Sequence, residues 1–421
     1  MLSRRALMND RIASESGDNL ALQNVKGSKM NALTVYGHST QDGTPSPDNP
    51  VPIVSAGDDG EINVTVQGGN LVDLSVTITM PGNSTYSYDG YTATLTTVLT
   101  EEDLTDLTPA NNRIYRSVFI QLGDDFAGKT VTISYDSAEI MFDMEQIIGL
   151  VYTDDSGTTI YNHLASNIES KSLTIAIPDT ATNIRFRIML IETNSFAENL
   201  TPGTYTAKIN GIMLALGASK LPWMPYKLPQ TLTLQTPNGL PGIPVDSGGN
   251  YTDENGQQWI CDEIDLTRGK YVQRTIVRQF RDMKWLKHSN TGTADTARFY
   301  TESLQDAKMT SNPGIFLNGL CNEFESVDGN YLYNNSITAI SGYYELSKKL
   351  FAKIVGVTEL EDFKNKTENA YILYELETPI ETDLSAEEID AYKALHTYSP
   401  TTTVSNDAGA WVKVGYREYR R

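Results

Sequence analysis

Residues 38–58 contain the densest group of side chains that could carry chemistry. The stretch HSTQDGTPSPDNPVPIVSAGD holds His38, three aspartates and four prolines. Imidazole and carboxylate groups bind metal ions and transfer protons, so one interpretation is an ion-binding or catalytic site. The other is a stiff piece of chain, because each proline fixes its own φ and holds the preceding residue extended. Since His38 lacks the close partners that a metal site needs, we interpret the stretch as a rigid elbow.

Enzymatic motifs are absent from the sequence. It contains no HExxH, GxSxG, P-loop or dinucleotide-binding motif. The four histidines, His38, His163, His288 and His396, are scattered among different expected elements. A carboxylate pair is harder to exclude, because a glycosidase needs only two acids roughly 5 to 9 Å apart, and Asp143 and Glu145 would share one strand face. We therefore predict a protein that is not an enzyme, with a glycan-degrading enzyme as the alternative.

Acidic loops offer oxygen ligands that suit calcium. They are GDD at 57–59, DDSG at 154–157 and TDENG at 252–256. None has the spacing of an EF-hand loop, and Asp-Gly and Asn-Gly turns explain the same residues. We predict no cofactor and leave a structural calcium ion as the alternative.

Aromatic side chains could form a platform for sugars, because their rings stack on the apolar faces of pyranoses. The candidate glycan-binding residues are Tyr86, Tyr88, Tyr91, Tyr331, Tyr333, Tyr343 and Tyr344. The first three flank a turn in STYSYDGYT. The alternative is that the tyrosines pack on a sheet or on a neighbouring subunit. We expect Trp223, in LPWMPYK, to close the end of a module as a plug.

Charge and cysteine usage exclude several classes of partner. The formal net charge of −20 argues against nucleic acid, whose affinity for proteins comes largely from clustered Lys and Arg. Cys261 and Cys321 are far apart and form neither a CxxC metal knuckle nor a disulfide framework. No run approaches the ~20 apolar residues that span a bilayer, and no apolar segment of signal-peptide length follows the N-terminus. We expect neither a nucleic-acid nor a membrane partner.

Alternating apolar residues predict strands along most of the chain. Residues 61–69, EINVTVQGG, place Ile62, Val64 and Val66 on one face. The pattern recurs in KTVTISYD, SLTIAIP and NIRFRIML, with turn residues between the runs. We predict a mainly β protein of antiparallel jelly-roll or β-sandwich modules, joined by extended linkers, with a few short helices. Capping boxes mark two of the helices, one at Ser385 and Glu388 and one at Thr358 and Glu361.

The length of 421 residues predicts two to four domains. The boundaries we predict are an N-terminal helix or tail for attachment at 1–31, β strands with the Pro-rich elbow at 32–66, a jelly-roll module of carbohydrate-binding type at 67–227, a β-rich connector at 228–280, a C-terminal mixed β module that is a candidate receptor-facing part at 281–370, and a closing strand-helix-strand segment at 371–421.

Four parts of the sequence resemble tail-associated structural proteins of bacteriophages and prophages of Gram-positive gut bacteria. They are LTVYGHSTQDGTPSPDNPVPIVSAGD, the module from GGNLVDLS to GTYTAKINGIMLALGASKLPWMPYK, the passage LPGIPVDSGGNYTDENGQQWICDEIDLTRGKYVQR and the closing YILYELETPIETDLSAEEIDAYKALHTYSPTTTVSND. Together they cover well over half of the chain.

The resemblance implies a virion protein of the tail tip, baseplate or fibre, made in the cytoplasm of the bacterial host. The resemblance implies that the protein forms a trimer with further copies of itself. It also implies two other kinds of partner, which are other phage tail proteins and host cell-surface polysaccharide. No binding or catalytic residue can be carried over from this family. We expect a non-enzymatic attachment protein, with a purely architectural tail or baseplate subunit as the alternative.

Overall fold

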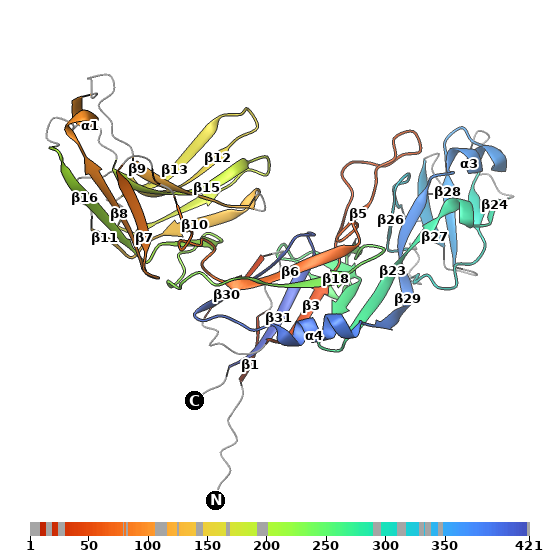
Figure 1. Cartoon of the computed structure of the whole chain (residues 1–421). Helices are drawn as coiled ribbons and strands as arrows, with labels where there is room; N and C mark the ends of the chain where they lie inside the picture. The colour runs from red at the N-terminus through yellow and green to blue at the C-terminus, as the bar shows by residue number, and fades with distance from the viewer. Residues whose placement is uncertain are drawn as a thin grey trace, which may run out of the picture.

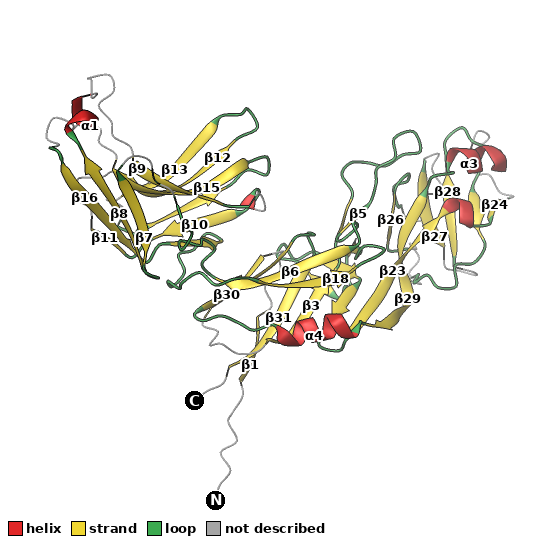
Figure 2. Ribbon diagram, in the orientation of Figure 1, coloured by secondary structure: helices red, strands yellow, loops and turns green. Residues whose placement is uncertain are grey.

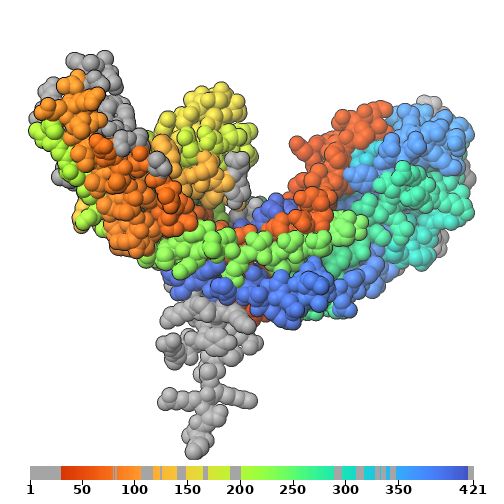
Figure 3. Space-filling model, in the orientation of Figure 1, coloured from red at the N-terminus to blue at the C-terminus, as the bar shows by residue number. Residues whose placement is uncertain are grey.

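The computed structural model describes residues 9–13, 19–23, 30–78, 80, 83–105, 116–123, 126–139, 146–165, 169–191, 201–288, 296–309, 317–327, 332, 338–343 and 348–418. Strands account for 51% of the structure and helices for 8%, and the sheets are antiparallel. This confirms the predicted fold class. Figures 1 and 3 show two arms that rise from a common base and leave a gap between them.

The base is a sandwich of a seven-stranded and a four-stranded sheet, here called the base sandwich (Figure 2). The larger sheet has the order β1 (Asn9–Ala13), β31 (Trp411–Glu418), β3 (Met30–Tyr36), β22 (Glu263–Asp265), β23 (Lys270–Gln279), β29 (Tyr371–Asp383) and β26 (Gly319–Cys321). The smaller sheet has the order β18 (Gln230–Gln235), β6 (Glu61–Gly68), β30 (Thr401–Asn406) and β2 (Asn19–Gln23). As predicted, Ile62, Val64 and Val66 are buried, and they share one core with Leu33 and Val412.

One arm, here called the insertion module, enters the base sandwich between β6 and β18. Its core is formed by residues between Leu71 and Leu214, including the predicted inward-facing Ile184, Phe186 and Ile188. Its sheets are β11-β16-β8-β7, β13-β12-β15-β9 and β14-β10-β17. The strand bounds are β7 Ser84–Tyr88, β8 Thr92–Leu99, β9 Arg116–Gln121, β10 Thr130–Ser134, β11 Ser137–Glu139, β12 Gln146–Thr153, β13 Thr159–Ala165, β14 Ser172–Ala176, β15 Thr182–Ile191, β16 Gly203–Asn210 and β17 Met213–Leu216, and the helix α1 covers Glu101–Thr105.

The other arm, here called the C-terminal module, enters between β23 and β29. Its core contains Phe280, Phe299, Phe363 and Tyr374. A sheet of order β24 (Trp285–Lys287), β25 (Phe299–Thr301), β28 (Lys349–Lys353) and β27 (Ala339–Tyr343) packs with the 3-10 helix η3 (Phe280–Asp282) and the helix α3 (Leu360–Lys366). The paired strands β23 and β29 extend from the base into this module, with a β-bulge between Gln273 and Thr275.

Two helices were predicted from capping boxes, and one box is confirmed. The helix α4 (Ala386–Ala394) has the reciprocal hydrogen bonds between Ser385 and Glu388. The box at Thr358 is wrong. The helix α3 begins one residue later, with Glu359 as its N-cap and no side-chain cap. A Thr and a Glu three residues apart therefore do not by themselves predict a capping box, because the helix can begin at a different residue.

The base sandwich is discontinuous in sequence. One core contains residues from three separately predicted segments, which are 32–66, the connector at 228–280 and the closing segment at 371–421. The N-terminal part, for which the sequence suggested a helix or tail, contributes the strands β1 and β2. Alternation along one strand indicates which face is buried, but it does not indicate which distant strand lies beside it.

The Pro-rich stretch forms more than an elbow. Its ends pair as β4 (Ser39–Thr40) and β5 (Val54–Ser55). The loop between them contacts the end of β26, whose Cys321 side chain lies in the core of the C-terminal module: the Val51 amide donates to the Asn322 carbonyl over 2.8 Å and the Gln41 side chain donates to the Cys321 carbonyl over 2.9 Å. The stretch therefore braces the base sandwich against that module.

A buried carboxylate joins the elements at the root of the C-terminal module. Asp262 Oδ1 accepts hydrogen bonds from the backbone amides of Arg274 and Thr275 and from the Thr275 hydroxyl, and its Oδ2 accepts one from the Tyr271 hydroxyl. These donors flank the β-bulge. Burial raises the pKa of Asp262 to about 6 against the opposing effect of the hydrogen bonds, so the carboxylate is the main form at neutral pH.

Replacing Asp262 tests this role. Asp262→Ala leaves four donors without their acceptor and is expected to lower the free energy of unfolding by about 3 kcal/mol. Asp262→Asn keeps the Oδ1 acceptor and should cost less than about 1 kcal/mol. Denaturant unfolding followed by tryptophan fluorescence measures both, with the exposed Asp48→Ala as a control. Equal losses for the alanine and asparagine variants would contradict this account.

Candidate functional site

A cleft of about 550 Å³ lies on the outer surface of the base sandwich. Three chain segments line it: the β4–β5 pair, the hairpin of β20 (Tyr251–Thr252) and β21 (Gln258–Cys261), and the turn before β31. The hairpin belongs to a small sheet of order β19 (Gly242–Val245), β21 and β20. The lining residues are His38, Thr40, Val54, Ser55, Ala56, Asp253, Glu254, Asn255, Trp259, Ala408, Gly409 and Trp411.

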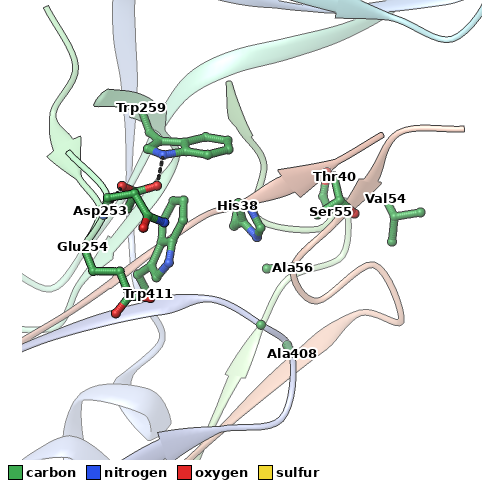
Figure 4. A pocket seen from close by; sticks show the side chains of 12 residues that line it. His38, Thr40, Val54, Ser55, Ala56, Asp253, Glu254, Trp259, Ala408 and Trp411 are labelled. Atoms are coloured by element: carbon green, nitrogen blue, oxygen red, sulfur yellow. Dashed lines mark hydrogen bonds between the residues drawn. The ribbon is translucent and has the colours of Figure 1, made fainter. Parts of the chain in front are cut away.

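Three aromatic rings pack together at one end of the cleft (Figure 4). The ring centroids of Trp259 and Trp411 are 4.9 Å apart with an edge-to-face geometry, and His38 lies 4.4 Å from Trp411 and 4.9 Å from Trp259. Tyr251, which is not among the lining residues, stacks on Trp411 with the ring centroids 4.6 Å apart. Both tryptophans are half-buried. Their neighbours in the strands, Ile260 and Val412, are buried, so the alternation of each strand places the indole on the opposite face.

Asp253 fixes the indole of Trp259. The Trp259 Nε1–H donates to Asp253 Oδ2 over 3.0 Å, and the amides of Asn255 and Gln257 donate to Oδ1 over 2.9 Å each. Partial burial opposes ionisation of this carboxyl. The hydrogen bonds outweigh that effect and, together with the nearby His38, hold the pKa of Asp253 below its usual range. Asp253 is therefore a carboxylate at neutral pH.

Backbone contacts hold His38 in place. Its amide donates to the Leu240 carbonyl over 3.1 Å, and its carbonyl accepts from the Ala56 amide over 2.8 Å. Burial lowers the pKa of His38, although Asp253 and a hydrogen bond with the backbone of Gly409 act in the other direction. The imidazole is therefore neutral at pH 7, so its ring acts as an aromatic surface.

Two glycines allow the chain segments beneath the cleft to approach closely. A Cβ at Gly37 would lie 2.2 Å from the Pro241 carbonyl oxygen, and one at Gly242 would lie 2.4 Å from the Gly37 carbonyl oxygen. Both contacts are with backbone atoms, which cannot move aside as a flexible side chain can. Glycine at these two positions is therefore what lets His38 reach the tryptophans.

The cleft combines aromatic rings with small polar groups. Thr40 and Ser55 offer hydroxyls, Asn255 offers an amide, and Asp253 and Glu254 offer carboxylates. This mixture suits a ligand with apolar ring faces and many hydroxyl groups. In the part of the chain that the structure describes, no three His, Cys, Asp or Glu side chains gather in a way that could hold a metal ion.

The tyrosines predicted as a glycan platform that the structure describes lie away from the cleft. Tyr86 and Tyr88 are half-buried and pack against the core of the insertion module, and the Tyr86 hydroxyl donates to the Leu74 carbonyl over 2.7 Å. Tyr91 is 39% exposed, and its ring contacts Trp223 at 4.8 Å. Tyr343 lies in β27. Tyr331, Tyr333 and Tyr344, like Asp143 and Glu145, lie outside the described residues.

The acidic loops proposed for calcium use their carboxylates in turns. Asp154 Oδ1 accepts from the amides of Ser156 and Thr158, and Asp58 Oδ2 accepts from the Ser55 amide. The third loop is the one in which Asp253 binds the Trp259 indole. Trp223 packs with Met224 and Tyr398, where the insertion module meets the base sandwich, so it lies at the end of the module as expected.

The other histidines lie in three separate places. His163 contacts Arg187 in the insertion module, and His288 contacts Arg298 in the C-terminal module. His396 follows the helix α4 and is exposed. The structure therefore brings only His38 into the cleft.

Comparison of the chain with protein-family models, curated proteins and solved structures finds no match. The site is interpreted from its own residues. Among the described residues, no helix has the length and apolar character needed to cross a bilayer.

The lowered pKa of His38 predicts a pH dependence of stability. In the unfolded chain a histidine takes up a proton near pH 6.5, whereas in the folded protein His38 does so only at lower pH. Stability should therefore fall as the pH drops from about 6.5 through the folded-state pKa. Thermal midpoints between pH 7.5 and 5 should show a smaller fall for His38→Gln than for the wild type. His396→Gln, at an exposed position, serves as the control, and a full-sized fall in His38→Gln would contradict the assignment.

Proposed function

We propose that the protein is a non-enzymatic attachment protein of a phage tail that binds host cell-surface glycan through the aromatic cleft. The observation that carries the glycan-binding part is the pairing of Trp259 and Trp411 in an open cleft lined by hydroxyl and carboxylate groups. The resemblance of the sequence to phage tail proteins supports the virion location. The β-sandwich modules suit a protein that must remain folded outside the cell.

The tryptophans are held in place before a ligand arrives. Trp259 is fixed by Asp253 on its indole nitrogen and by Trp411 on its ring. The ring of Tyr251 stacks on Trp411 and restricts its orientation. Binding to such a preorganised surface costs little side-chain entropy, so stacking on a pyranose contributes more of its energy to affinity.

The charge of the cleft favours a neutral sugar. Asp253 is ionised, Glu254 adds a second carboxylate, and the described residues of the lining include no Lys or Arg. An anionic sugar would be repelled at this short range. The carboxylates can instead accept hydrogen bonds from the hydroxyl groups of an uncharged hexose or N-acetylhexosamine.

A shallow site of this size gives weak binding by itself. We propose that the protein acts as a trimer or another oligomer joined to further tail proteins, so that several clefts engage one polysaccharide. Linked sites raise the overall avidity by roughly 10²- to 10⁴-fold without any new contact.

Substitution of Trp259 tests the proposal. Trp259→Ala should weaken binding to neutral host-wall polysaccharide about tenfold or more. The substitution removes the stacking surface, and a loss of about 1.4 kcal/mol of binding free energy corresponds to a factor of ten in affinity. Tyr91→Ala removes an exposed aromatic ring in the insertion module and is the matched control. Binding is measured by surface plasmon resonance on immobilised host glycans and by competition with phage adsorption.

The alternatives give different results. Unchanged binding by Trp259→Ala, with a loss in Tyr91→Ala, would move the site to the predicted tyrosines. Absence of binding to any host envelope fraction would favour a purely architectural subunit. Shortening of the polysaccharide during incubation would indicate a glycan-degrading enzyme.

A further inference from the structure

We propose a second, independent saccharide site on the insertion module, specific for sugars that carry a carboxylate. It lies on the outward face of the sheet β13-β12-β15-β9. In Figure 1 this sheet lies on the side of the module that is turned toward the other arm. It does not share a residue with the aromatic cleft, and it does not depend on the function proposed for that cleft.

The strand register places the relevant side chains in two adjacent rows. One row crosses the four strands through His163, Gly149, Arg187 and Phe119. The next row contains Tyr161, Val151, Arg185 and Gln121. The inward-facing neighbours Ile184, Phe186 and Ile188 fill the core, so both arginines project from the opposite face.

Two aromatic rings flank the guanidinium groups and remain open to solvent. Arg185 lies 4.9 Å from the centroid of Phe119, and Arg187 lies 5.3 Å from Phe119 and 5.8 Å from Tyr161. Phe119 is 38% exposed and Tyr161 is 55% exposed. Cation–π contacts hold the planar guanidinium groups against the rings and restrict their orientation.

The patch has a positive charge in a strongly acidic protein. Arg187 Nη1 lies 3.2 Å from His163 Nε2, and burial together with the Arg187 charge lowers the pKa of His163 to about 4. His163 is therefore neutral, and the charge comes from the two arginines. The chain as a whole has a net charge of −20, so this face differs sharply from the average surface.

Two details indicate that the patch is arranged to receive a ligand. In the described part of the chain, the buried Nε of Arg185 has no hydrogen-bond partner. At position 149 a Cβ would lie 2.4 Å from Cδ2 of His163, so glycine leaves room for the imidazole to reach Arg187. Because this Nε is buried, the donors that a ligand can reach are the terminal guanidinium nitrogens of the half-buried Arg185, on the same side of the sheet as the open rings.

A uronic acid meets these requirements in one molecule. Its carboxylate accepts two parallel hydrogen bonds from a guanidinium, and the apolar face of its ring stacks on Tyr161 or Phe119. A neutral sugar offers the ring without the anion. An isolated inorganic anion offers the charge without the ring, so neither matches the whole patch.

The experiment compares trigalacturonate with the same trisaccharide after reduction of its carboxylates to alcohols. Ligand-observed NMR with the full chain, at pH 7 and low salt, should show at least tenfold tighter binding of the acidic form. Arg185→Gln should abolish this preference. Arg185→Lys keeps the charge but lacks the bidentate fork, and should retain only part of it.

Two further variants separate this site from the cleft and from loss of the fold. Trp259→Ala should leave trigalacturonate binding unchanged. Tyr161→Ala, at an exposed position, should weaken both trisaccharides at this site while the thermal midpoint stays close to that of the wild type. Equal affinity for the two trisaccharides, no binding of trigalacturonate, or loss of its binding in Trp259→Ala instead of Arg185→Gln would each overturn the proposal.

Discussion

The arrangement of the molecule depends on a close crossing of three chain segments in the base sandwich. The Gly37 amide donates to the Asp262 carbonyl over 2.8 Å, and the Asp262 amide donates to the Pro241 carbonyl over 2.9 Å. The same crossing places His38 against Leu240, and its spacing requires glycine at position 37. From this point the Asp262 side chain fixes the bulge that leads into the C-terminal module, and the neighbouring residues carry the aromatic cleft. Stability and the candidate site therefore share one set of backbone contacts.

The sequence is sufficient to predict where strands form, but it does not predict which strands pair with each other. Strand β6 was predicted because Ile62, Val64 and Val66 alternate with polar residues, and the structure buries all three. The nested order, in which two modules interrupt one sandwich, depends on pairings such as Tyr36 with Trp411. Such a pairing joins residues hundreds of positions apart, and no local pattern encodes it.

The cleft was missed for the same reason. His38 has no partner near it in the sequence, because its partners Trp259 and Trp411 come from strands far along the chain. The pattern of the loop at 252–256 predicts a turn, with calcium binding as the alternative, but it does not indicate that Asp253 holds an indole. One usable signal was present: in β31 the apolar Trp411 precedes the core residues Val412 and Val414, so it occupies the outer face. The arginines of NIRFRIML give a similar signal in the insertion module.

The most direct test of the central claim is a crystal structure of the full chain soaked with a neutral oligosaccharide released from the host wall. We predict density for a pyranose stacked against Trp259 or Trp411, with hydroxyl groups within hydrogen-bond distance of Asp253 or Glu254. Density for the sugar beside Tyr86, Tyr88 and Tyr91, with an empty cleft in the same crystal, would contradict the account.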